Sequence, residues 1–310
     1  MELRGLGKTG LEVSALGFGG APVGYLETDR RQVAEILNTL LDRGVNLIDT
    51  AASYRGSEEV IGEAVGHRRD DYVLVSKCGQ AFDEIEGAAW SATAIEQTVD
   101  RALARLATDR IDVMLLHSCD LATLQRGEAL GALVAARDAG KIRFLGYSGD
   151  NEAAAYAAGL DEVAVIETSV SICDQANIDA VLPLARANDV GVLAKRPIAN
   201  AAWKDAAEQR GIYVGYAQTY SERLAGMAIA PAELGFPGEA AAAWPEIALR
   251  FTLAQAGVST AIVGTTKTSH VEGNLAALSK GPLGDDATAK LREAFRRAET
   301  AAGETWSGQT

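Results

Sequence analysis

The sequence predicts an α/β protein whose eight parallel strands close into a barrel with helices outside, a (β/α)8 TIM barrel. Short apolar runs alternate with amphipathic stretches along almost the whole chain, and each pair spans about 30 residues, as a strand–helix–strand step requires. The runs are apolar throughout, which is typical of strands buried on both faces of a parallel sheet. Eight such runs are present, the number that closes a barrel of this kind.

The individual elements follow from two periodicities of the hydrophobic pattern. A continuous apolar run indicates a buried strand, and apolar residues three or four apart indicate one face of a helix. The runs predict strands over residues 13–18, 45–50, 72–77, 111–117, 142–148, 163–168, 191–196 and 259–265. The intervening stretches predict helices near residues 31–43, 57–66, 93–107, 125–138, 151–158, 177–188, 239–256 and 268–279.

Four segments lie outside these units but within one expected domain of residues 1–310. Residues 1–12 predict a hairpin that caps the N-terminal end of the barrel, because LRGL and LEVSAL flank the turn sequence GKTG. Residues 286–301 predict an extra C-terminal helix, and residues 302–310 a polar tail. Residues 199–238 are expected to be a long irregular loop over the active site, since connections of this length in a compact domain are usually functional.

An open doubly wound sheet is the alternative arrangement of alternating strands and helices. Its first strand is usually followed by a G-x-G-x-x-G turn that binds the phosphates of a dinucleotide. Here that position reads Gly17-Phe-Gly19-Gly20-Ala-Pro22, with proline in place of the third glycine. The pattern therefore favours the closed barrel.

The composition is that of a folded chain with a strongly acidic balance. Of the 310 residues, 48% are hydrophobic, and the formal net charge is −13. A field of this sign repels phosphate backbones and anionic lipids, so neither nucleic acid nor a membrane is an expected partner. A membrane-spanning helix needs about 18 consecutive apolar residues, and no stretch of this sequence is that long and apolar. No secretory signal segment is recognised either. Three widely spaced cysteines, Cys78, Cys119 and Cys173, fit a cytoplasmic protein.

Ionisable residues stand at the ends of three consecutive expected strands, where a barrel of this type carries its chemistry. Asp49 ends the second strand, Tyr54 follows it in the loop, Lys77 ends the third strand and His117 ends the fourth. Because these strands are neighbours, we expect the four side chains to share one pocket. No metal site is expected, because the three histidines are far apart in the sequence.

These four residue types suit the reduction of a carbonyl group. Hydride addition to the carbonyl carbon makes an alkoxide, which needs a proton from a positioned acid. Tyr54 would be that acid, and the ammonium of Lys77 would lower the pKa of Tyr54 from about 10 toward the working pH. Asp49 would keep Lys77 charged, and His117 would hold the carbonyl oxygen by a hydrogen bond.

The same residues lie in motifs that resemble those of the aldo-keto reductase family. Nearly the full chain is covered by segments in the family's order, namely GVNLIDTAASYRGSEEVIGEAV, VLVSKCG, LLHS, GKIRFLGYS and IVGTTKTSHVEGNLAAL. The resemblance implies a barrel with the catalytic tetrad Asp49, Tyr54, Lys77 and His117. It also implies an extended nicotinamide dinucleotide, NADP(H) more often than NAD(H), and a small carbonyl compound or alcohol as substrate.

The residues after the last strand predict an anion site for such a cofactor. Gly264, Thr265 and Thr266 precede a helix, whose first N–H groups and positive dipole end attract phosphate. Lys267 and His270 are nearby cations that could meet a 2′-phosphate. The resemblance implies further cofactor contacts, by Gly20, Asp49, Ser148, Glu167, Lys195, Arg196, Pro197, Ile198 and Asn274.

Four positions differ from the usual family sequence. Gly149 follows Ser148 where asparagine is common, and Glu167 takes the place of a glutamine that helps to hold the nicotinamide carboxamide. Lys195 stands where many members stack a tyrosine, and Gly273 precedes the expected adenine contact. These differences keep open a second hypothesis, a cofactor-binding regulatory module of the same fold with slow turnover.

Two further alternatives concern the chemistry and the pocket. Outside the family, His117 and a carboxylate would suit a barrel isomerase acting on a phosphorylated sugar. Phe82 and Trp90 follow the third strand, and we expect them either to line the substrate pocket or to pack the loop.

Overall fold

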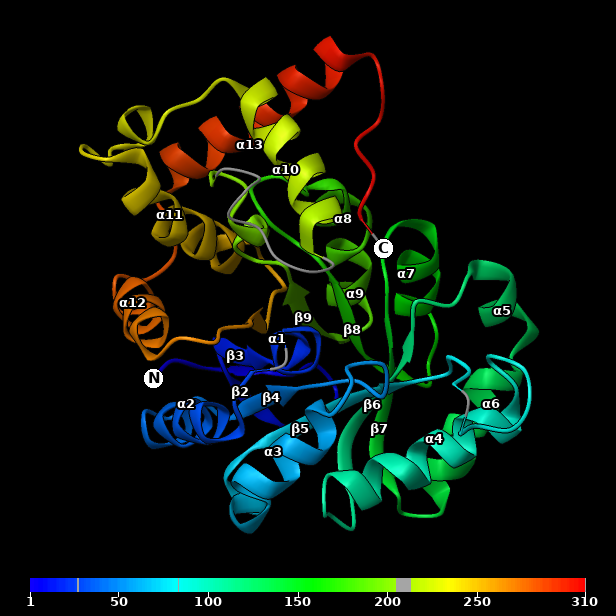
Figure 1. Ribbon diagram of the computed structural model, residues 1–310. Helices are drawn as coiled ribbons and strands as arrows, with labels where there is room; N and C mark the ends of the chain where they lie inside the picture. The colour runs from blue at the N-terminus through cyan, green and yellow to red at the C-terminus, as the bar shows by residue number, and fades with distance from the viewer. Residues whose placement is uncertain (27, 83, 205–212, 310) are drawn as a thin grey trace.

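The computed structural model describes residues 1–26, 28–82, 84–204 and 213–309, and it confirms the predicted barrel (Figure 1). Eight parallel strands form a closed barrel in the order β10–β3–β4–β5–β6–β7–β8–β9. Each strand therefore pairs with the strand that precedes it and the strand that follows it in the chain, and β10 pairs with β3 to close the ring. Their bounds are β3 Leu16–Gly19, β4 Leu47–Asp49, β5 Val73–Cys78, β6 Ile111–His117, β7 Ile142–Ser148, β8 Val163–Ser169, β9 Gly191–Lys195 and β10 Thr260–Val263.

The outer helices bury one apolar face each against the strands. In α2, the first long helix, four apolar residues at helical spacing are buried, as the sequence predicts: Val33, Ile36, Leu37 and Leu40. The helices of this layer are α2 Arg30–Asp42, α3 Ser57–Val65, α4 Ala92–Arg105, α5 Leu121–Arg126, α6 Glu128–Asp138, α7 Asn151–Ala158, α8 Ala176–Ala180, α9 Leu182–Ala187, α11 Ala240–Ala254 and α12 Thr268–Ser279. Short helices α1 Ala21–Tyr25 and η1 Gly66–Asp71 lie in connections.

Three predicted elements are interrupted in the structure. The helix expected over residues 125–138 is two helices, because Gly127 has a φ of +76° and ends one before the next begins. The helix expected over residues 177–188 is also two, α8 and α9, with Pro183 in the first turn of the second. The strand expected over residues 13–18 divides between the hairpin and β3.

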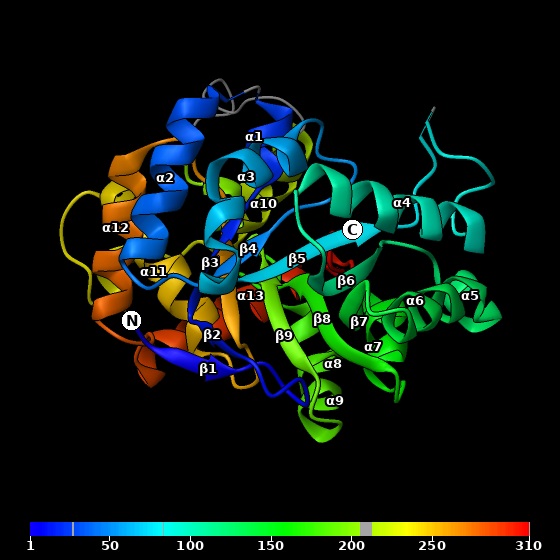
Figure 2. The same cartoon turned by 90° about the horizontal axis from the view of Figure 1, so that it is seen from below.

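The N-terminal hairpin caps the end of the barrel at which the strands begin. Its strands, β1 Leu3–Gly5 and β2 Glu12–Ser14, pair antiparallel, and Figure 2 shows them at this end of the molecule. Leu6 and Val13 are fully buried in one apolar cluster with interior side chains of the barrel. The cap is also joined to the start of β9, because the N–H of Lys8 donates to the carbonyl of Asp189 over 2.6 Å. Burial of these leucine and valine side chains stabilises this end of the fold.

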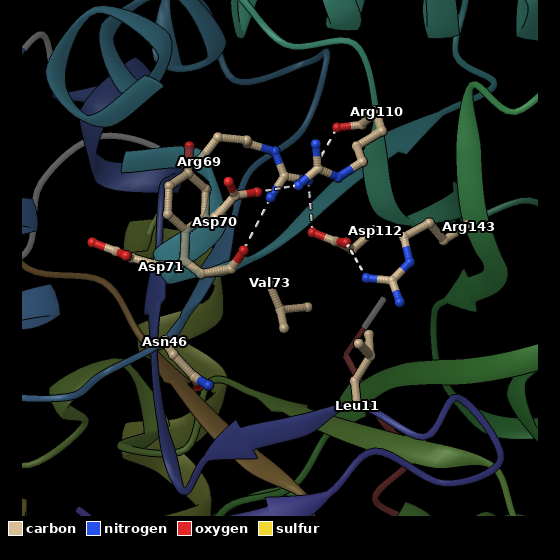
Figure 3. A pocket seen from close by; sticks show the side chains of 10 residues that line it. Leu11, Asn46, Arg69, Asp70, Asp71, Val73, Arg110, Asp112 and Arg143 are labelled. Carbon is tan, nitrogen blue, oxygen red and sulfur yellow. Dashed lines mark hydrogen bonds and ion pairs between the residues drawn. The ribbon is translucent and has the colours of Figure 1, made fainter. Parts of the chain in front are cut away.

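Beside the cap, a group of charged side chains lines a small pocket at the end of the barrel where the strands begin (Figure 3). The buried carboxylate of Asp112 accepts from Arg69 over 2.7 Å, from Arg143 over 2.9 Å and from the N–H of Leu74 over 2.9 Å. Arg110 pairs with Asp70. Polar groups at this end of a (β/α)8 barrel serve stability rather than chemistry, and the satisfied partners here fit that role.

The segment over residues 199–238 is more ordered than the expected irregular loop. It contains η2 Ala199–Ala201, α10 Tyr213–Met227 and η4 Pro231–Leu234, while residues 205–212 lie outside the described part. Figure 1 shows α10 beside the extra C-terminal helix, α13 Asp285–Ala302, at one end of the molecule. The sequence analysis assigns the apolar and aromatic residues of α10 to a loop, so this helix is not among the predicted elements.

The last residues fold back along the barrel and do not extend into solvent, although residues 302–310 are expected to be a polar tail. Trp306 is buried against Phe295, with ring centres 5.0 Å apart. Gly308 and Asn151 exchange two hydrogen bonds of 2.7 and 3.0 Å. The N–H of Gln309 donates to Asp174 over 3.1 Å, whereas residue 310 lies outside the described part. The tail therefore packs beside α7, at the carboxyl ends of the strands (Figure 1).

Replacing Leu6 by alanine tests the contribution of the hairpin cap. Leu6 is fully buried, so Leu6→Ala should lower the free energy of unfolding by about 2–5 kcal/mol, as measured by urea denaturation. Leu3, in the same hairpin, is 50% exposed, so Leu3→Ala should change it by less than about 0.5 kcal/mol. Equal losses in the two variants would show that the cap is not part of the stabilising core.

Candidate active site

The strand ends bring the predicted ionisable residues to one cavity. Asp49 is the last residue of β4, Lys77 lies near the end of β5, and His117 is the last residue of β6. Tyr54 lies in the loop between β4 and α3. Asp49, Tyr54 and His117 line a cavity of about 740 Å³ at this end of the barrel, and Lys77 is buried directly beneath it.

The ammonium of Lys77 lies between two carboxylates. Its Nζ atom is 2.5 Å from Oδ1 of Asp49, 3.0 Å from Oε2 of Glu167 and 3.1 Å from the carbonyl oxygen of Thr50. Burial alone would lower the pKa of Lys77, but the charges of Asp49 and Glu167 raise it above its ordinary value. Lys77 is therefore protonated. Burial and then the charge of Glu167 raise the pKa of Asp49, against the opposing effect of Lys77.

The Tyr54 ring is held from three sides. It makes edge-on contacts with Tyr25 and His117, at centre distances of 5.4 and 5.9 Å, and Nζ of Lys77 lies 5.3 Å from its centre. Burial raises the pKa of Tyr54 above its ordinary value, and Lys77 offsets only part of this rise. The sequence-based expectation of a lowered pKa is therefore not met in this structure, because desolvation of the phenolate outweighs the nearby ammonium.

His117 is a neutral imidazole. Burial lowers its pKa, and the charges of Lys77, Lys195 and Arg196 lower it further. Its Nδ1 lies 3.4 Å from the hydroxyl of Ser53. A neutral imidazole can donate one hydrogen bond to a carbonyl oxygen without carrying a charge into the cavity.

Lys195 and Arg196, at the end of β9, share a buried carboxylate that the sequence prediction missed. Nζ of Lys195 lies 2.9 Å from Oδ2 of Asp150, and the guanidinium of Arg196 lies 3.9 Å from the same atom. Asp150 also accepts from the N–H of Ser169 over 2.7 Å. Lys195 lowers the pKa of Asp150 although burial opposes this effect. The position of Asp150, two residues after the end of β7, was the available signal.

Steric crowding explains why position 149 is a glycine. A Cβ atom at this position would lie 2.3 Å from the hydroxyl of Tyr147, which donates to the carbonyl of Cys119 over 2.8 Å. The buried tyrosine therefore occupies the space into which a larger residue at position 149 would extend.

The cavity runs from Tyr54 to the predicted anion site. Besides the ionisable groups, its lining includes Ser148, Glu167, Lys195, Arg196, Pro197, Ile198, Gly264, Thr265, Thr266 and His270. Gly264 approaches Pro22 so closely that a Cβ atom would lie 2.6 Å from its ring. Lys267 and Asn274 lie in and near the first turns of α12, outside this lining, and Gly20 lies behind Asp49, to whose carbonyl its N–H donates over 2.7 Å.

One buried acceptor shows that the residues fit a nicotinamide dinucleotide. Oε2 of Glu167 has no hydrogen-bond donor, although it lies 3.0 Å from Lys77, and it belongs to a residue that lines the cavity. An amide N–H2 group could satisfy this oxygen. At the other end, the first turn of α12 has no side-chain cap, and the N-terminus of such a helix suits phosphate.

Comparison with known proteins matches residues 15–296 to the model of the aldo/keto reductase family. The chain belongs to this family. It is 28% identical to the L-galactose dehydrogenase of Arabidopsis thaliana, with 90% of this chain and 89% of that protein covered. It is 29% identical to the uncharacterised oxidoreductase YqkF of Bacillus subtilis, with 92% and 94% covered. Among solved structures, the holo form of aldo-keto reductase AKR11C1 from Bacillus halodurans is similar, with a TM-score of 0.80, 26% identity and coverage of 96% and 97%.

Membership of the aldo/keto reductase family makes the protein an oxidoreductase of carbonyl compounds and alcohols that uses a nicotinamide cofactor. Within the described ranges, no group of three or more histidine, cysteine, aspartate or glutamate side chains could hold a metal ion. In the same part of the chain, no helix combines the length and apolar character needed to cross a membrane.

Phe82 and Trp90 of this aldo/keto reductase pack the loop after β5. The guanidinium of Arg101 lies 5.0 Å from the centre of the Phe82 ring. Trp90 covers Gly79, where a Cβ atom would lie 2.1 Å from the indole ring. Among the described residues, neither side chain is part of the cavity lining. A role of these two aromatics in the substrate pocket stays a prediction.

An NMR titration of the histidines tests the state of His117. Because its pKa is lowered, His117 should remain neutral at pH values where an unperturbed histidine, with a pKa of about 6.5, is half protonated. The resonance that is lost in His117→Gln should therefore not shift between about pH 7 and pH 6. A normal titration of that resonance would contradict the neutral imidazole.

Proposed function

We propose that the protein is an NAD(P)(H)-dependent oxidoreductase that interconverts an aldehyde or ketone with its alcohol, with Tyr54 as the general acid and base. The observation that carries the proposal is the single cavity that joins Asp49, Tyr54 and His117 to the backbone around Gly264. An acid, a neutral hydrogen-bond donor and a phosphate site at suitable ends of one cavity are what hydride transfer to a carbonyl group requires.

The proton chemistry follows from the groups around Tyr54. In the reductive direction, the Tyr54 hydroxyl gives its proton to the carbonyl oxygen while neutral His117 orients that oxygen by a hydrogen bond. Lys77, kept protonated by Asp49 and Glu167, stabilises the tyrosinate that results. A bound nicotinamide dinucleotide supplies the hydride for this direction or accepts it in the reverse one. Tyr54 regains its proton from solvent before the next turnover.

The cofactor contacts form two groups. Ser148, Glu167, Lys195, Arg196, Pro197 and Ile198 would hold the nicotinamide half, and Gly264, Thr265 and Thr266 would hold phosphate at the start of α12. Lys267 and His270, both exposed beside this site, would meet a 2′-phosphate, and Asn274 the adenine. The charge of Lys267 favours NADP(H) over NAD(H), whereas burial and Lys267 lower the pKa of His270, which would offer a neutral imidazole. The three cysteines, all buried and unpaired, fit a reducing cytoplasm.

Removal of the Tyr54 hydroxyl tests the proposed acid. Tyr54→Phe should lower kcat for carbonyl reduction by about 10²–10⁴-fold, because the proton donor is lost, while NADPH still binds. Turnover is followed by nicotinamide absorbance over a panel of aldehydes and ketones, and binding by fluorescence titration. Tyr156 is an exposed tyrosine on α7, so Tyr156→Phe should retain full activity as the matched control. Normal turnover of Tyr54→Phe would refute the role of Tyr54.

Removal of the Lys267 ammonium tests the preference for NADPH. A charged group that pairs with a 2′-phosphate contributes enough that Lys267→Ala should weaken NADPH binding by about tenfold or more, with NADH binding unchanged. Lys280, at the other end of α12, pairs with Glu246 over 2.6 Å, so Lys280→Ala serves as the control. Equal affinities of Lys267→Ala and the unmodified protein for NADPH would exclude Lys267 from the phosphate site.

A further inference from the structure

Two carboxyl groups and one ammonium group meet at the inner end of the cavity. Asp49 and Glu167 are both buried, and they share the single ammonium of Lys77 at distances of 2.5 and 3.0 Å. Neutral His117 adds no positive charge to this group. Burial and the charge of Glu167 raise the pKa of Asp49, so two negative charges beside one ammonium group are costly here.

The two cations of the neighbouring wall, Lys195 and Arg196, face a carboxylate of their own, Asp150. Lys195 is engaged by Asp150 at 2.9 Å, and Arg196 also faces Asp150 and lies 4.1 Å from the centre of the Tyr216 ring. Lys195 and Arg196 both line the cavity, as does Glu167. The cavity is therefore polarised, with carboxylates beside Tyr54 and basic groups along the end of β9.

This polarity matches the oxidised form of a nicotinamide cofactor. The nicotinamide ring carries a positive charge when oxidised and none when reduced, whereas the phosphates are negative in both states. Hydride has to pass to the carbon whose oxygen is held by Tyr54 and His117, so the ring belongs at the end of the cavity that contains Glu167. There, the buried carboxylate of Glu167, which pairs with Lys77 over 3.0 Å, lines a site of low dielectric, in which a nearby opposite charge interacts strongly.

We propose that Glu167 stabilises the positive charge of the oxidised nicotinamide ring, so that the site binds the oxidised cofactor more tightly than the reduced one. This inference rests on the proposed function. As hydride leaves the reduced ring for the carbonyl carbon, Tyr54 gives its proton to the carbonyl oxygen and the ring becomes cationic beside Glu167. Glu167 thus acts as a specificity-determining residue for the redox state of the cofactor, and it makes the bound reduced cofactor a stronger hydride donor.

The test compares dissociation constants for NADP⁺ and NADPH, measured by isothermal titration calorimetry without substrate. In the unmodified protein, Kd should be lower for NADP⁺ than for NADPH. In Glu167→Gln, which keeps the size and hydrogen-bonding capacity of the side chain, the ratio of Kd for NADP⁺ to Kd for NADPH should rise by about tenfold. Glu167→Asp keeps the charge and should keep a ratio close to the original one. Exposed Glu152 on α7 provides the control Glu152→Gln, with no change in ratio.

The outcomes separate this inference from the proposed function. Equal changes in both dissociation constants in Glu167→Gln would overturn the inference and leave the proposed function intact, because Glu167 would then be only an uncharged contact. Tighter binding of NADPH than of NADP⁺ by the unmodified protein would also overturn it, and this measurement requires no variant to fold. Binding of neither NADP⁺ nor NADPH, with NAD⁺ and NADH also failing to bind, would overturn the proposed function itself.

Discussion

A buried ammonium at the centre of the barrel requires partners, and the arrangement around Lys77 supplies two carboxylates and a carbonyl oxygen. Desolvation of a lysine is costly, so Lys77 remains charged only because Asp49 and Glu167 approach to 2.5 and 3.0 Å. Those residues come from strands β4 and β8, which are not neighbours in the ring. The charge of Lys77 therefore depends on closure of the whole barrel, and through it so does the state of Tyr54.

The two ends of the barrel use charged residues differently. At the strand beginnings, both oxygens of Asp112 accept hydrogen bonds, from two arginines and a backbone N–H. At the strand ends, Glu167 pairs with Lys77 over 3.0 Å and also lines an open cavity. The chemistry belongs to the strand ends because the cavity there is lined by Asp49, Tyr54 and His117.

The barrel and the strand-end residues could be predicted from the sequence because both depend on local pattern and chain order. Asp49, Lys77 and His117 each close an apolar run, and consecutive parallel strands bring such positions together. The contact of Lys77 with Glu167 could not be predicted in this way, since it joins strands on different sides of the ring. Nor could the rise in the pKa of Tyr54, which is set by how deeply the packed loops bury it. Helix α10 was missed although Tyr213, Tyr216 and Tyr220 stand three and four residues apart, as on one face of a helix, because residues 199–238 were interpreted as one long connection.

The folded-back C-terminal residues are expected to tolerate changes of side chain better than changes of length. The hydrogen bonds that hold Ser307, Gly308 and Gln309 use main-chain groups of these residues, as in the contact of Arg223 with the carbonyl of Ser307 over 2.9 Å. Such contacts depend on chain length rather than on side-chain identity, so an insertion or deletion of one residue after Trp306 would disturb them more than most replacements. Gly308 is an exception, because a methyl group there would approach Asn177 to 2.7 Å.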